Sequence, residues 1–67
     1  MSWIMQIIAL LAQLQNNALV QDIEQCVLTN TTPAAIWQCV LNKLAGHTIS
    51  PEDQAKIDAA KVFAAKL

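Results

Sequence analysis

The first 21 residues, Met1 to Gln21, carry no charged side chain, although apolar residues crowd this segment. Such a segment needs apolar cover, either from the rest of its own chain or from another molecule. The whole chain has only 67 residues with which to supply that cover. A domain this short buries about 60% of the surface that its unfolded chain exposes. The N-terminal segment therefore predicts either a tightly packed small core or a partner.

A long helix is expected over residues 2–29, because this stretch lacks Gly and Pro and its apolar residues recur with helical spacing. Asparagine readily bonds its own backbone, so the pair Asn16–Asn17 marks a place where the helix could break. Beyond the pair, Leu19, Ile23 and Val27 form an apolar face. If the helix is continuous, this face is rotated by about 100° from the apolar stripe formed by residues between Trp3 and Leu14. The alternatives are one continuous helix and two helices that meet at this pair.

Two further helices have clear signals at their ends. Pro33 follows Asn and Thr residues that favour N-cap positions, and Gly46 suits a left-handed C-terminal cap, so a helix is expected between them. The run Ser50–Asp53 supplies an N-cap, a first-turn proline and two carboxylates beside the positive end of a helix dipole. The prediction is an all-α fold, a single small helical domain over residues 1–67 that forms a bundle of three helices, at about 2–29, 33–45 and 51–66, or of four if the first helix breaks.

Cys26 and Cys39 are the two cysteines of the chain. If residues near Asn30 form the turn of a helical hairpin, the two lie at comparable heights on its arms, so their spacing permits a disulfide. Free cysteines are usually small buried hydrophobes, and this interpretation is favoured over the bridge. Metal ligation is disfavoured, because neither C-x-x-C nor H-x-x-x-H spacing occurs.

Histidine is the residue type that titrates near neutrality, and His47 is the only histidine. No serine or cysteine lies in a recognised nucleophile motif, so we expect a solvated or capping histidine rather than a catalytic base. Glu52 and Asp53 are explained by the start of a helix rather than by a cation site. The sequence therefore predicts no catalytic residue, no cofactor-binding residue and no metal site, and the chain is not expected to be an enzyme.

Charged residues make up only 13% of the chain, against about 25% in typical domains, and the net charge is −1. This balance disfavours nucleic acid and anionic lipid as partners. The apolar run from Trp3 to Leu14 is too short for a membrane span of about 20 residues, and it lacks the basic residues of a signal peptide or an interfacial membrane helix. Membrane contact is disfavoured, and a cytoplasmic location is expected.

Our leading hypothesis is a non-catalytic protein-protein interaction or assembly subunit that packs against copies of itself or a larger host complex. Depletion of charge among long aliphatic residues and Trp is typical of interface cores. The expected interaction face consists of Trp3, Ile4, Ile7, Ile8, Leu11 and Leu14. An ordinary core helix explains the same stripe equally well. The next hypotheses are a small regulatory or inhibitory protein that occludes a larger target, and then a membrane-surface peptide.

Overall fold

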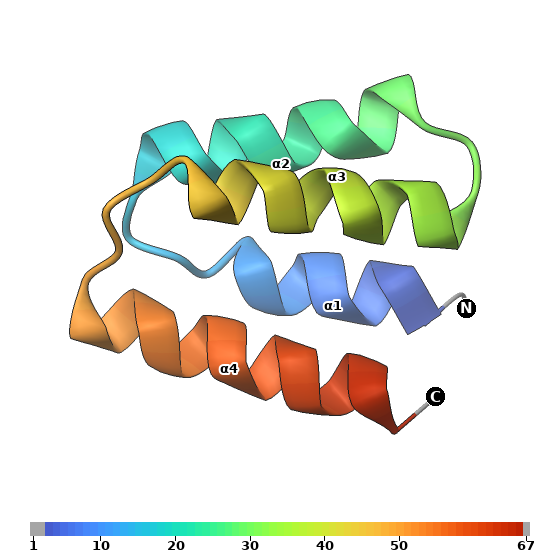
Figure 1. Ribbon diagram of the computed structural model, residues 1–67. Coiled ribbons are helices and arrows are strands. Elements are labelled where there is room, and N and C mark those ends of the chain that lie inside the picture. Colours follow the sequence, from blue (N-terminus) through green and yellow to red (C-terminus); the bar gives the residue numbers. More distant parts are fainter. Residues whose placement is uncertain (1–2, 67) are drawn as a thin grey trace.

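The computed structural model describes residues 3–66, and Figure 1 shows their arrangement. The helices are α1 (Trp3–Leu11), α2 (Asn17–Thr29), α3 (Pro33–Ala45) and α4 (Pro51–Ala65). No strand occurs within this described part of the chain. The predicted all-α bundle is confirmed, in its four-helix form. The expected helix start at Ser2 lies outside the described residues.

The expected long first helix is divided at the asparagine pair. α1 ends at Leu11, and α2 begins at Asn17. Asn16 has extended backbone (φ −77°, ψ 100°), and its side-chain oxygen accepts the N–H of Leu19 at 3.1 Å. A short polar side chain at this position thus caps a new helix, as Asn commonly does. The alternative of one continuous helix is therefore wrong. The break lets the apolar faces of α1 and α2, which differ in direction, both point into the same interior.

The starts of α3 and α4 follow the predicted capping chemistry. Thr32 Oγ1 accepts the N–H of Ala35 at 3.3 Å, and Ser50 Oγ accepts the N–H of Asp53 at 3.4 Å. A proline follows each cap in the first helical turn. Gly46 ends α3 as expected, but its φ of −89° is right-handed, so the left-handed cap predicted for it is wrong.

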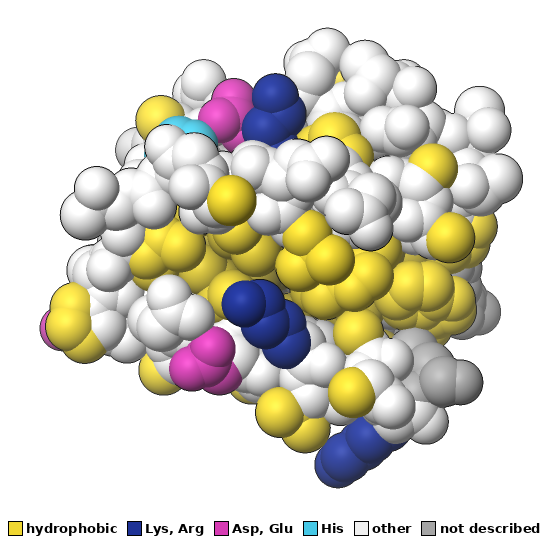
Figure 2. Space-filling view, in the orientation of Figure 1, with side chains coloured by type: hydrophobic (Ala, Val, Ile, Leu, Met, Phe, Trp, Pro, Cys, Tyr) yellow, Lys and Arg dark blue, Asp and Glu magenta, His cyan; other side chains and the backbone are white. Residues whose placement is uncertain are grey.

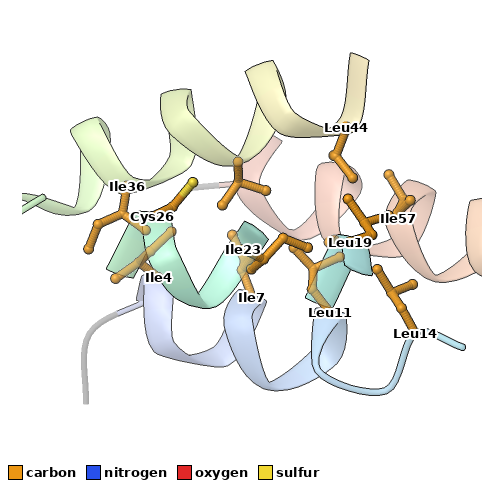
Figure 3. Packing of buried hydrophobic residues seen from close by; sticks show 12 residues of the cluster. Ile4, Ile7, Leu11, Leu14, Leu19, Ile23, Cys26, Ile36, Leu44 and Ile57 are labelled. Atoms are coloured by element: carbon orange, nitrogen blue, oxygen red, sulfur yellow. The ribbon is translucent and has the colours of Figure 1, made fainter. Parts of the chain in front are cut away.

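All four helices contribute to one apolar core, and Figure 3 shows side chains of α1 and α2 directed into it. Full burial of a large aliphatic side chain contributes about 1.5–3 kcal/mol, so a core of this size can support a small domain. The buried apolar residues are Ile4, Ile7, Leu11, Leu14, Leu19, Ile23, Cys26, Ile36, Val40, Leu44, Ile57 and Ala60.

A disulfide between Cys26 and Cys39 joins α2 to α3, so the prediction of free cysteines is wrong. The two helices pack side by side and are linked only by residues 30–32. This short link places the cysteines at matching heights, with Cα atoms 5.6 Å apart, a separation that suits a bridge. α2 and α3 therefore form the helical hairpin on which the possible bridge was conditional.

We predict that loss of the disulfide lowers the free energy of unfolding by about 3 kcal/mol. The bridge joins cysteines 13 positions apart, and a closed loop of this length restricts the unfolded chain. Urea unfolding of the oxidised and reduced wild-type chain measures this difference, and the reduced chain keeps both cysteine side chains. A Cys26→Ala/Cys39→Ala variant should lose at least as much. Equal unfolding midpoints with and without reductant would contradict the prediction.

Candidate functional site

The predicted interaction face lies largely inside the molecule. Four of its six side chains are 5% exposed or less, and they belong to the chain's own core: Ile4, Ile7, Leu11 and Leu14. Trp3 and Ile8 are partly buried against that core. The core-helix alternative accounts for these positions, because the break after α1 lets the helix fold back onto α2 and α3. In the folded chain this stripe is therefore not a free surface, contrary to the expectation.

The outer side of α1 carries a different apolar feature, a groove between α1 and α4 with a volume of about 340 Å³. Figure 2 shows hydrophobic side chains forming a band over α1, between α3 and α4. Met5 is 43% exposed and is one of the larger hydrophobic side chains that solvent reaches. The residues that line this α1–α4 groove are Met5, Gln6, Ala9, Leu10, Gln13 and Phe63.

The α1–α4 groove is uncharged, since none of its lining residues is ionisable. Its polar groups are the side-chain amides of Gln6 and Gln13, each of which can both donate and accept hydrogen bonds. Met5 adds a flexible thioether that fills irregular gaps well. This chemistry can hold apolar side chains and pair amides, but it supplies no acid, base or nucleophile.

One wall of the groove is positioned by a buried carboxylate. Asp53, in the first turn of α4, is 2% exposed. Its Oδ1 accepts the backbone N–H of Gln15 at 2.9 Å, and its Oδ2 accepts that of Asn16 at 3.2 Å. Asp53 therefore ties α4 to the turn between α1 and α2, a role that the helix-start interpretation missed. A signal was present, because Asp53 shares the helical stripe of Ile57 and Ala60, which are both buried.

Lys56 adds a second tie at the same end of the groove. Its Nζ donates to the backbone carbonyl of Gln13 at 2.9 Å. That carbonyl lies just beyond α1, where helix ends leave acceptors without partners. Together, Lys56 and Asp53 fix the first two turns of α4 beside the residues that follow α1.

The structure places His47, expected as a solvated or capping histidine, beside a carboxylate. Its Nε2 lies 2.7 Å from Oδ2 of Asp22, so the loop after α3 is linked to α2. The two side chains are 21% and 42% exposed, and pairs this accessible contribute about 0–1 kcal/mol. The pair is separated by 25 positions in the sequence, and no local pattern relates the two residues. It shares no residue with the α1–α4 groove.

Within residues 3–66, no group of three His, Cys, Asp or Glu side chains is placed to hold a metal ion. None of the helices described is both long enough and apolar enough to cross a membrane.

No protein-family model, curated protein or solved structure matches the chain. Its function therefore has to be inferred from its own side chains.

We predict that Asp53→Asn lowers the free energy of unfolding by about 2 kcal/mol, because an amide nitrogen would face one of the two part-buried N–H donors. Thermal or urea unfolding followed by circular dichroism measures the loss. Asp58→Asn is the matched control, since Asp58 is an exposed residue of the same helix, and it should change stability by less than about 0.5 kcal/mol. Equal effects of the two substitutions would show that the ties to Gln15 and Asn16 contribute nothing.

Proposed function

We propose that this chain is a non-catalytic protein-interaction module that binds another protein through the α1–α4 groove. The observation that carries the proposal is the combination of an apolar groove with a helix whose described residues carry no charge. Charged residues are depleted at the cores of protein interfaces, whereas Met and aromatic residues are enriched there. Met5 and Phe63 place residues of both favoured types in the groove.

The groove is also held in shape before any partner arrives. Asp53 and Lys56 fasten α4 at one end of it, and the disulfide closes the α2–α3 pair against which α1 packs. A surface that is already ordered loses less conformational entropy when it binds. This rigidity supports binding by a preformed surface rather than by folding on contact.

The proposal of a non-catalytic role rests on the chemistry of the same groove. Proton transfer and nucleophilic attack need ionisable or nucleophilic side chains beside the substrate. The lining residues supply amides, a thioether and hydrocarbon instead. The His47–Asp22 pair uses none of the groove's residues.

The disulfide supports a working location different from the one expected on sequence grounds. Structural disulfides form and persist in oxidising surroundings and are rare in the reducing cytosol. The Cys26–Cys39 bond therefore favours an oxidising compartment over the cytoplasm.

We predict that a photo-crosslinking amino acid at Ala9, inside the groove, captures a discrete protein in the cells that make this chain. The matched position is Gln21, which is exposed on α2 and lies outside the groove. Mass spectrometry of the products should show one adduct from Ala9 that is at least about tenfold weaker from Gln21. Products that do not differ between the two positions, or no product from Ala9, would contradict the proposed docking surface.

A further inference from the structure

We propose that the partner in the α1–α4 groove is a second copy of this chain, packed antiparallel about a two-fold axis that passes through Ala9. The inference rests on the proposed function and deepens it by naming the partner. It is carried by the charge, the spacing and the size of the residues exposed on α1.

Symmetry restricts which surfaces can meet their own copy. Across a two-fold axis the same patch faces itself, so a patch that carries one sign of charge brings like charges together. The described residues of α1 have no charged side chain, so this repulsion does not arise. Gln6 and Gln13, the polar residues of the groove, are neutral as well.

The spacing along α1 fits an antiparallel pair. Met5, Gln6 and Ala9 are the exposed residues of α1, and Ala12 and Gln13 are exposed at the first two positions after it. They are spaced symmetrically about Ala9, at three and four positions on either side. An axis at Ala9 would set Met5 opposite Gln13 of the second copy, and Gln6 opposite Ala12.

The side-chain sizes suit the same arrangement. Ala9 is the smallest of the residues that line the groove, and a small residue at the crossing point lets two helices approach closely. Gln6 would lie against a methyl group of the second copy, and the flexible Met5 would reach the far end of its groove. Larger side chains thus alternate with smaller ones, as in close packing.

The available area predicts weak association. A standard stable interface takes about 800 Å² from each partner, which is about a fifth of the 4159 Å² surface of this chain. A helix of nine residues offers less than that. We therefore expect a dimer that forms at about 100 μM or above rather than a permanent one.

The first test is sedimentation equilibrium of the purified chain from about 10 μM to 1 mM. The wild type should pass from monomer to dimer, without higher oligomers, because a two-fold interface closes on itself. Ala9→Asp would set two carboxylates against each other at the axis and should weaken association by at least about tenfold. Gln21→Asp adds the same charge on an exposed position of α2 and should leave the association unchanged.

The second test locates the axis. Both native cysteines are in the disulfide, so Ala9→Cys adds a single reactive thiol. At concentrations that favour the dimer, a short bismaleimide should link two copies of Ala9→Cys at least about tenfold faster than two copies of Ala18→Cys. Ala18 is an exposed alanine of α2 and serves as the matched control. Circular dichroism establishes that each variant is folded.

A chain that stays monomeric throughout the concentration range would overturn the proposal of a second copy as partner. Equal linking rates for the Ala9→Cys and Ala18→Cys variants would overturn it as well. Failure here is distinct from failure of the proposed function. If photo-crosslinks from Ala9 join a different protein while the purified chain stays monomeric, the groove is a docking surface for another partner. If neither a crosslink nor a dimer forms, both proposals fall.

Discussion

The packing of α4 beside α1 depends on the carboxylate of Asp53. This carboxylate lies in the interior and accepts hydrogen bonds from the backbone N–H groups of Gln15 and Asn16. A buried carboxylate is costly unless its oxygens find donors, and a sharp turn between helices leaves backbone donors without partners. In this chain the turn supplies the donors that the carboxylate needs, and the carboxylate supplies the acceptors that the turn needs. The tie holds the turn that follows α1 and seats α4 beside it, so it helps to position the two helices that border the groove.

Local chemistry explains why much of the fold could be predicted. Caps and first-turn prolines act within three or four residues. Thr32, Pro33 and Ser50 therefore predict the helix starts that the structure shows. The pair Asn16–Asn17 likewise marked the break, although its sequence left two alternatives open. The disulfide depended on the tertiary approach of α2 to α3, which the spacing of Cys26 and Cys39 permitted but did not require.

The candidate site was harder to predict, because an apolar stripe does not state what will cover it. Ile7 and Leu11 are fully buried because α2, α3 and α4 together supply enough hydrocarbon to enclose them. The groove arises instead from the weakly apolar side of α1, where Ala9 and two glutamines meet Phe63 of α4, 50 or more positions away. The tie from Asp53 to Gln15 likewise joins residues 38 positions apart.

Amide hydrogen exchange of the native chain at Gln15 and Asn16 reports on how firmly Asp53 holds the turn after α1. These two N–H groups lie in a connecting segment rather than in a helix, where exchange is ordinarily fast. If Asp53 holds them, both N–H groups exchange at least about a hundredfold more slowly than the N–H of the exposed Thr31 in the α2–α3 link. Exchange of all three at similar rates would contradict it.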